Sequence, residues 1–203
     1  MPTLKAISQA CPVLHDPVLY RSIFLLAFYA FLRLANIAPH SKAAFSPSRH
    51  LLHKDIIFAQ PGAHILIKWA KNMQKRTEYK FIQIPFMQDI DICPVRALRQ
   101  LLASRNFEPH QPLFAENVSP CTQVIDTKIS DALKKIPSHL NIPIKGHTFH
   151  AFRRSGAIVA FGQNVNLEDI KAHGNWHSDA IFDYLRADLS APPSVPRAFQ
   201  ALC

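Results

Sequence analysis

Acidic residues are scarce in this sequence of 203 residues. Asp and Glu number 14 against 23 Lys and Arg, which gives a formal net charge of +9 with neutral histidines. Only 18% of the residues are charged and 48% are hydrophobic, which excludes an intrinsically disordered chain. The basic surplus favours an anionic partner, usually nucleic acid or an acidic membrane surface. Composition alone leaves open a basic soluble protein that has no such partner.

Paired cysteines and long apolar runs are also missing. The cysteines, at positions 11, 93, 121 and 203, form no CxxC pair, so we expect neither a disulfide framework nor a zinc ribbon. Reduced thiols in an intracellular protein are the natural interpretation. The N-terminal MPTLKAISQA lacks the features of a signal peptide. The longest apolar run, residues 23–32, is too short to span a bilayer and predicts a buried helix rather than a membrane protein.

The sequence does contain one β-rich section between helical segments, and no internal repeat. Residues from about Pro17 to Ile37 are apolar nearly all round, which is typical of a central core helix. Three short runs then follow at 55–59, 64–69 and 80–85, the first two joined at Pro61-Gly62. They predict a small three-stranded antiparallel sheet, which helices must cover to complete a core.

Helical patterns dominate the rest of the chain. Segments with helical spacing or capping signals occupy 94–106, 122–136, 150–162, 166–174 and 178–186. Asn166 is a candidate N-cap, as is Ser178 or Asp179, and Gly174 is a candidate helix stop. We therefore expect a mainly α fold of the α+β kind. Residues 1–14 are taken as an N-terminal segment, 15–190 as one domain and 191–203 as a proline-rich tail.

Four side chains are candidates for chemistry. Arg33 interrupts an apolar helix, where a guanidinium needs an anion or a set of acceptors. A structural arginine that reaches water or pairs with an acid is the alternative. His150 and Arg153 share a helix face at i and i+3 and form a donor pair suited to phosphate oxygens. Tyr184 fits half-buried packing, or a nucleophile if cations lie nearby.

The order of these residues along the chain matches that of a known family. The segments FLRLANIAPHS, ILIKWAKN, CPVRALRQLL, FRRSGA and GNWHSDAIFDYL resemble the catalytic domain of the tyrosine recombinase (phage integrase) family, across residues 15–190. The likeness is nearest to recombinases of DIRS and crypton mobile elements. It implies a helical catalytic domain with a small sheet, double-stranded DNA as partner and self-assembly on that DNA. It also implies strand cleavage and rejoining that needs no metal and no ATP, in the nucleus if the source is a eukaryote.

The resemblance assigns a role to each candidate. The implied site residues are Arg33, Lys71, His150, Arg153, Trp176 and Tyr184. The two arginines and the histidine would hold the scissile phosphate, and Tyr184 would form a 3′-phosphotyrosyl link. Lys71 would protonate the leaving oxygen, with Lys68 as the alternative. On this basis Arg153→Ala should abolish cleavage and leave the fold intact, whereas Arg154→Ala should not affect cleavage.

The sequence departs from the family pattern in three places. Asn175 stands directly after Gly174, where the family has His or Trp, and Trp176 follows one residue later, so we assign it the supporting role. Asn36 replaces an acidic residue that commonly follows the first arginine. The helical DNA-clamping domain that normally precedes the catalytic domain is expected to be absent.

Three other interpretations remain open at this stage. The chain could be an inactive, truncated or domesticated DNA-binding remnant, or a basic helical domain with no nucleic-acid role. It could also be a metal protein, because His147, His150, His173 and His177 form HxxH and HxxxH pairs. No HExxH motif supports a metal site, and we expect His147 to be a helix-start residue instead.

Overall fold

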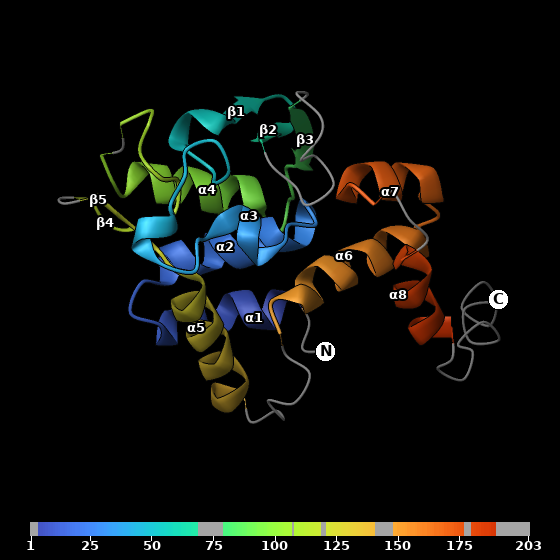
Figure 1. Ribbon diagram of the computed structural model, residues 1–203. Coiled ribbons are helices and arrows are strands. Elements are labelled where there is room, and N and C mark those ends of the chain that lie inside the picture. The colour runs from blue at the N-terminus through green and yellow to red at the C-terminus, as the bar shows by residue number, and fades with distance from the viewer. Residues whose placement is uncertain are drawn as a thin grey trace.

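A three-stranded antiparallel sheet lies over one side of a helical body (Figure 1). The computed structural model describes residues 4–68, 79–106, 108–118, 121–140, 148–176 and 180–189. The strands are β1 (Ile56–Ala59), β2 (Gly62–Ile67) and β3 (Lys80–Pro85), in the order β1-β2-β3. Ile65 of β2 pairs with Ile56 and Ile82. The predicted sheet is confirmed, with strand ends shifted by one or two residues.

The sheet has one buried and one exposed face because its side chains alternate. Ile65, Ile82 and Ile84 are buried against the helices, whereas Ile57 and Phe81 on the other face are exposed. This alternation is the period of two that a half-buried strand requires. The sheet and the helices therefore share one hydrophobic core.

The central helix is shorter than its apolar pattern predicts. α2 covers Pro17–Tyr29 and is capped by Asp16, whose side chain accepts a hydrogen bond from the backbone N–H of Leu19. The expected continuation to Ile37 was wrong, because Phe31 adopts a left-handed conformation with φ 48° that ends the helix. A new short helix, α3, covers Leu34–Ile37. The break turns Arg33 from a helix-interior residue into the residue that starts α3.

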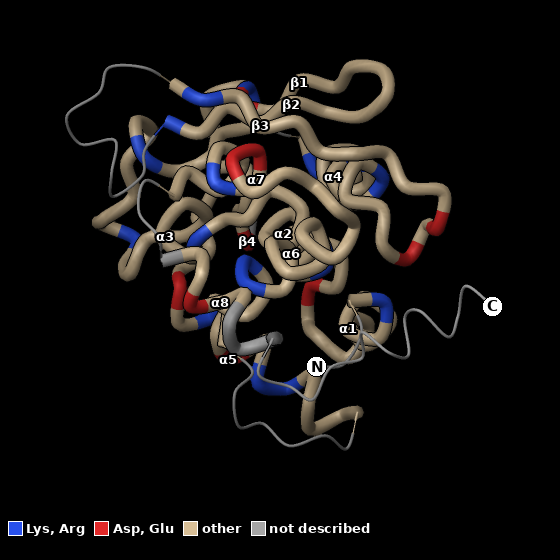
Figure 2. Tube along the Cα trace, turned by 90° about the vertical axis from the view of Figure 1, so that its right-hand side faces the viewer, with Lys and Arg blue, Asp and Glu red and all other residues tan. Residues whose placement is uncertain are grey.

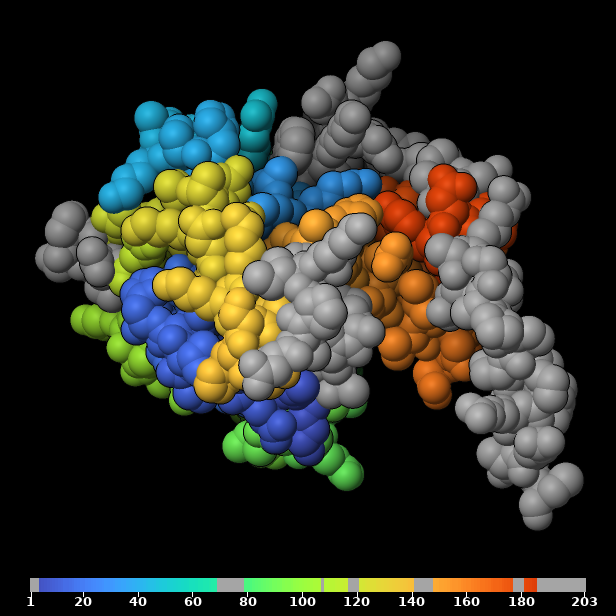
Figure 3. Space-filling view, turned by 90° about the horizontal axis from the view of Figure 1, so that it is seen from below, coloured from blue at the N-terminus to red at the C-terminus, as the bar shows by residue number. Residues whose placement is uncertain are grey.

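The remaining N-terminal and central elements pack around α2. They are α1 (Leu4–Ala10), α4 (Pro94–Ala103), β4 (Ala115–Val118), β5 (Cys121–Gln123), α5 (Asp126–His139) and the 3-10 turns Cys11–Val13, Lys42–Ala44, His53–Asp55 and Ile90–Ile92. Viewed from below, α5 lies beside the N-terminal segment (Figure 3). α5 begins later than predicted because residues 121–123 form a strand paired with β4. That two-stranded hairpin was missed in the sequence.

Three helices form the C-terminal part of the fold. α6 (His150–Gly162) runs diagonally across the body toward α7 (Leu167–Gly174) and α8 (Ala180–Leu189) in Figure 1. Asn166 caps α7 as predicted, since its side chain accepts from the N–H of Glu168. Ser178 and Asp179, the expected cap of α8, lie outside the described residues. A second small core joins these helices to Phe31, with Ala157, Ile170, Trp176, Ile181 and Leu185 as its other buried members.

Two further expectations concern cysteines and membranes. Cys11, Cys93 and Cys121 carry free thiols, and Cys203 lies outside the described residues. Within the described ranges, no helix has the length and apolar character needed to cross a bilayer.

Candidate active site

Helix α6 carries His150 and Arg153 to the centre of a basic cluster. The helix lies close against α2, since a Cβ built on Gly156 would stand 2.4 Å from the carbonyl oxygen of Phe28. Phe152 stacks on Phe24 of α2 with ring centroids 5.3 Å apart, which fixes the rotation of α6. Arg153 consequently points into the fold, whereas Arg154 is exposed.

His150 and Tyr184 meet although 34 positions separate them in the chain. The His150 Nε2 and Tyr184 Oη atoms lie 2.8 Å apart, and the two rings meet edge to face. Burial lowers the pKa of His150, and the charges of Arg153, Arg33 and Arg154 lower it further. A neutral imidazole therefore faces the phenol, and its Nε2 can accept the hydroxyl hydrogen.

Arg153 is the most deeply placed charge of the cluster, with 2% of its surface exposed. Its guanidinium donates to the carbonyl oxygen of Phe31 and, over 2.7 Å, to that of Gly174. It also lies 3.8 Å from the centroid of the Trp176 ring. Burial lowers the pKa of Arg153 to about 9, with Arg33 lowering it and Tyr184 raising it. The group stays protonated at neutral pH because that value is still well above 7.

Arg33 lies at the start of α3, near enough to lower the pKa of both Arg153 and His150. Its backbone N–H donates to the Asn36 side-chain oxygen over 3.1 Å. Asn36 thus fixes the backbone that carries Arg33, where a carboxylate had been the family expectation. Among the described residues, the recorded ion pairs engage other basic side chains and leave out Arg33, Arg153 and Arg154.

The site therefore has a positive charge that no described acidic residue neutralises by an ion pair. Seen from the α7 side, acidic positions lie in the first turn of α7 and at the right-hand edge, whereas basic positions lie along the sheet and beside α6 (Figure 2). Clustered cations repel one another, and an anion bound among them removes that repulsion. The cluster is suited to a ligand such as phosphate, whose oxygens accept several charge-assisted hydrogen bonds.

A tight turn after α7 explains the unusual position of the tryptophan. Asn175 adopts the left-handed conformation, with φ 55° and ψ 51°, and the N–H of Trp176 donates to the carbonyl of Lys171. The chain folds back so far that a Cβ on Gly174 would stand 1.7 Å from the indole. Trp176 thereby lies between Gly174 and Arg153, with its ring centroid 6.0 Å from that of Tyr184. The turn brings the tryptophan, one place later than the family pattern, to the cluster.

The two lysine candidates differ in what the structure describes. Lys71 lies outside the described residues. Lys68 Nζ is 2.5 Å from Asp55 Oδ2, and both side chains are buried, with 7% and 1% of their surfaces exposed. Asp55 also accepts from the N–H of Leu52. Lys68 is therefore bound to a buried carboxylate and is a poor proton donor for a substrate.

Of the four histidines considered as metal ligands, two lie outside the described residues and two make other contacts. His147 and His177 lie outside the described residues, so the expected helix-start role of His147 also falls there. Among the residues that are described, no group of three or more His, Cys, Asp or Glu is arranged to hold a metal ion. His150 is bonded to Tyr184, and His173 Nε2 lies 2.8 Å from the carbonyl oxygen of Tyr29. No pattern in the sequence indicates this last contact, because Tyr29 and His173 are 144 positions apart.

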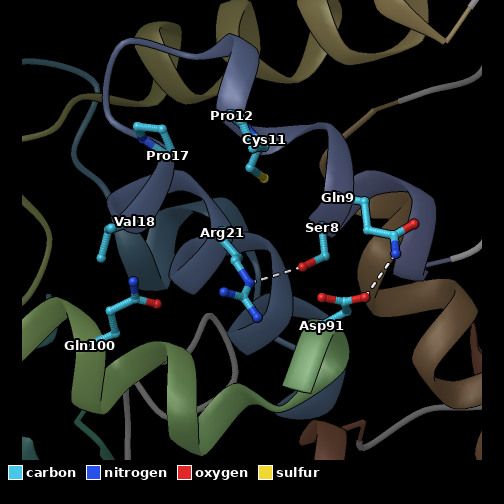
Figure 4. Close-up of a pocket in the computed structure, with 9 residues that line it drawn as sticks. All are labelled: Ser8, Gln9, Cys11, Pro12, Pro17, Val18, Arg21, Asp91 and Gln100. Atoms are coloured by element: carbon cyan, nitrogen blue, oxygen red, sulfur yellow. Dashed lines mark hydrogen bonds between the residues drawn. The ribbon is translucent and has the colours of Figure 1, made fainter. Parts of the chain in front are cut away.

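A separate pocket of about 370 Å³ lies between α1, α2 and α4 (Figure 4). Arg21 points into it and donates to Ser8 Oγ and to the carbonyl of Ile90. Asp91 also lines this pocket and accepts from Gln9. Because Arg21 is already hydrogen-bonded and the Asp91 carboxylate lines the same pocket, this pocket is less suited to an anion than the cluster around Arg153.

Acid should destabilise the fold in a range set by its histidines. Burial lowers the pKa of His50 and of His173 from the usual value of 6.5, so the folded state favours their neutral forms. The unfolded chain then binds protons more readily as pH falls below 6.5. We expect full stability above pH 6.5 and a falling melting temperature between pH 6.5 and 5. Thermal denaturation at pH 7.5, 6.5 and 5.5 measures this, and an unchanged midpoint would contradict it.

Comparison with known proteins identifies the fold. No protein-family model and no curated protein matches the chain. Its structure is similar to XerH site-specific recombinase bound to difH substrate in a pre-cleavage complex, with a TM-score of 0.63, 14% identity, and 93% of this chain and 51% of that chain covered. For the post-cleavage complex of XerH on a palindromic difH substrate, the TM-score is 0.66 and the identity 14%, with 98% of this chain and 50% of that chain covered. For XerA recombinase, the TM-score is 0.52 and the identity 11%, with 94% of this chain and 62% of that chain covered.

The fold is thus that of tyrosine recombinase catalytic domains, as the sequence motifs predicted. The chain spans about half the length of the XerH structures that it matches. Identity this low shows the fold alone, and it leaves the roles of the individual side chains to the geometry.

Proposed function

We propose that this protein cleaves and rejoins DNA strands through a covalent 3′-phosphotyrosyl intermediate. One observation carries the proposal. Tyr184 Oη lies 2.8 Å from His150 Nε2, within a cluster of arginines that includes Arg153 and Arg33. A phenol beside a neutral base and fixed cations is the arrangement that an attack on a phosphodiester needs. The recombinase fold adds support.

The chemistry follows from the positions of these groups. Tyr184 Oη attacks the phosphorus and gives its proton to His150 Nε2, which accepts it because the ring is neutral. A new bond joins the phenol oxygen to phosphorus while the bond from phosphorus to the 5′ oxygen breaks. Arg33 and Arg153 stabilise the charge on the non-bridging oxygens. One phosphate ester replaces another, so the step consumes neither water nor ATP.

The leaving 5′ oxygen needs a proton, and we propose Lys71 as its donor. The ion pair of Lys68 with Asp55 supports this choice, because it leaves Lys68 engaged within the fold. We assign Trp176 a supporting role, based on its contact with the guanidinium of Arg153.

Trapping the intermediate on nicked DNA tests the proposal. We expect the protein to form a denaturation-resistant adduct with a pool of labelled nicked duplexes of randomised sequence, because the nick lets the cleaved fragment diffuse away. Tyr184→Phe should abolish the adduct and change the melting temperature little, since it removes one hydroxyl at the surface of the site. Electrophoresis under denaturing conditions measures the adduct. Tyr79→Phe is the matched control, because Tyr79 is 64% exposed.

The burial of Arg153 favours a second candidate function. With 2% exposure and two donor atoms bonded to backbone carbonyls, Arg153 already has a structural role. The chain could therefore bind DNA as a remnant that performs no cleavage. Salt-dependent DNA binding without an adduct on any nicked duplex would decide for this candidate. Absence of DNA binding even at low salt would contradict both.

The wider setting of the reaction belongs to the same proposal. We propose that residues 15–190 form the catalytic unit and that efficient DNA binding requires a second, clamping domain as well. Self-assembly of several copies on double-stranded DNA would bring strands together for exchange. Integration of a DIRS-like or crypton-like mobile element is the biological process that the sequence resemblance favours, with the nucleus as the location in a eukaryote.

A further inference from the structure

Two helices end at the candidate site, and basic side chains bind their last carbonyl groups. The carbonyls at a helix C-terminus have no partner within the helix. At the end of α2, Tyr29 accepts from His173 Nε2 and Phe31 accepts from Arg153. At the end of α7, Gly174 accepts from Arg153. We name this set of three hydrogen bonds the carbonyl clasp.

We propose that His173 is a positioning residue that joins the two halves of the candidate site through the carbonyl clasp. Arg33 comes two residues after Phe31, and Trp176 comes two residues after Gly174. Any change in the separation of the α2 and α7 ends therefore moves Arg33 relative to Trp176 and to α8, which carries Tyr184. That His173 serves catalysis rests on the proposed DNA cleavage, whereas the clasp itself rests on the geometry.

The chemistry of the contact defines the state of the His173 ring. A carbonyl oxygen only accepts hydrogen bonds, so Nε2 must carry the proton. The ring also meets Phe31 edge to face, with centroids 4.6 Å apart. Burial favours the neutral form of the ring, and Lys80 and Arg153 are the charged groups near it that add to this preference. His173 thus contributes a directed hydrogen bond without adding charge to a cluster that is already positive.

The backbone of Phe31 shows why the end of α2 needs stabilising contacts. Its φ of 48° is unfavourable for a residue with a Cβ, and it persists only where packing imposes it. The Phe31 ring packs against His173 and Trp176 and faces Gly156. His173 touches both the backbone before this residue and the ring itself. The hydrogen bond and the ring contact of its side chain go to α2 and Phe31, so His173 positions the site instead of contacting the reacting atoms.

Three variants of the full chain test the role of His173. His173→Leu removes the hydrogen-bond donor and puts an apolar side chain in its place. His173→Gln restores an N–H donor near the position of Nε2. Val95→Ala is the control, because Val95 is a buried core residue of α4 and takes part in none of the three hydrogen bonds of the clasp. The readouts are the NMR signal of the Arg153 Nε–H, assigned through its loss in Arg153→Lys, and adduct formation on nicked duplexes.

The Arg153 Nε atom is buried and makes no hydrogen bond to the described residues, so its N–H is protected from water only while the guanidinium stays in place. We expect this signal to exchange slowly with water in the wild type and in His173→Gln, and to broaden or vanish in His173→Leu. Adduct formation should fall about 100-fold in His173→Leu, as for a misplaced reacting group, and should recover largely in His173→Gln. Val95→Ala should lower the melting temperature and keep both readouts. If His173→Leu keeps the slow signal, or if His173→Gln behaves like His173→Leu in both readouts, the proposal is wrong.

The NMR arm separates this proposal from the proposed function. If the wild type forms no adduct on any duplex, DNA cleavage is wrong, while a signal lost in His173→Leu and restored in His173→Gln still establishes the clasp. If His173→Leu does not fold, His173→Phe takes its place, because it keeps an aromatic ring against Phe31 and lacks the donor.

Discussion

Replacing Arg153 by alanine is expected to abolish adduct formation and also to lower the free energy of unfolding by about 3–5 kcal/mol. The carbonyl oxygens of Phe31 and Gly174 lose their donors in a buried place, and each such loss costs about 1–3 kcal/mol. The stacked contact with Trp176 is lost as well. Urea denaturation measures the stability, and the nicked-duplex assay measures cleavage at a temperature at which the variant is still folded.

Two variants separate charge from geometry at this position. Arg154→Ala removes an exposed cation from the same helix and should change stability little. Arg153→Lys keeps the charge, but a lysine cannot donate to both carbonyls in the planar geometry of a guanidinium. We expect it to recover only part of the stability. An Arg153→Ala protein as stable as the wild type would show that the clasp contributes nothing to the fold.

Gly156→Ala is expected to destabilise the protein by about 3 kcal/mol, at the upper end of overpacking costs. The added methyl group would stand 2.4 Å from the carbonyl oxygen of Phe28 and 2.6 Å from the Phe31 ring. Backbone atoms cannot rotate away, so α6 must shift from α2 and carry His150 and Arg153 with it. Adduct formation should therefore fall together with the urea midpoint.

The same helix supplies the matched control. Gly162 also lies in α6, but a Cβ there meets nothing within 4 Å. Gly162→Ala should be neutral or stabilise the protein by up to about 1 kcal/mol, because alanine favours the helix more than glycine does. Equal effects of the two substitutions on the urea midpoint would show that contact with α2 does not decide the result at Gly156.

Much of the fold could be predicted because local patterns specify it. The sheet follows from alternating strands around Pro61-Gly62, and α6 and α7 follow from apolar spacing and the Asn166 cap. The end of α2 could not be predicted, because an apolar run has no feature that indicates a left-handed Phe31. The β4–β5 hairpin was missed because its strands are short, and residue 123 had been assigned to a helix.

The sequence indicates which side chains to consider for the candidate site, but not which contacts those side chains make. Helix spacing places His150 and Arg153 on one face, but only the packing of α6 on α2 determines how deeply Arg153 is buried. For that reason we expect Arg153→Ala to destabilise the fold, and not to leave it intact as the sequence suggests. His173 was proposed only as a metal ligand, since its partner on α2 comes from a distant part of the chain. The ion pair of Lys68 with Asp55 was likewise invisible in the sequence.

The turn at Gly174, Asn175 and Trp176 makes three neighbouring positions depend on one another. Glycine is needed because the indole lies on it, and asparagine suits the left-handed backbone that returns the indole. A substitution at one of the three alters what the other two can accept. The segment would therefore change in evolution as a single unit, and a relative with an aromatic residue directly after the glycine would have no reason to keep the asparagine.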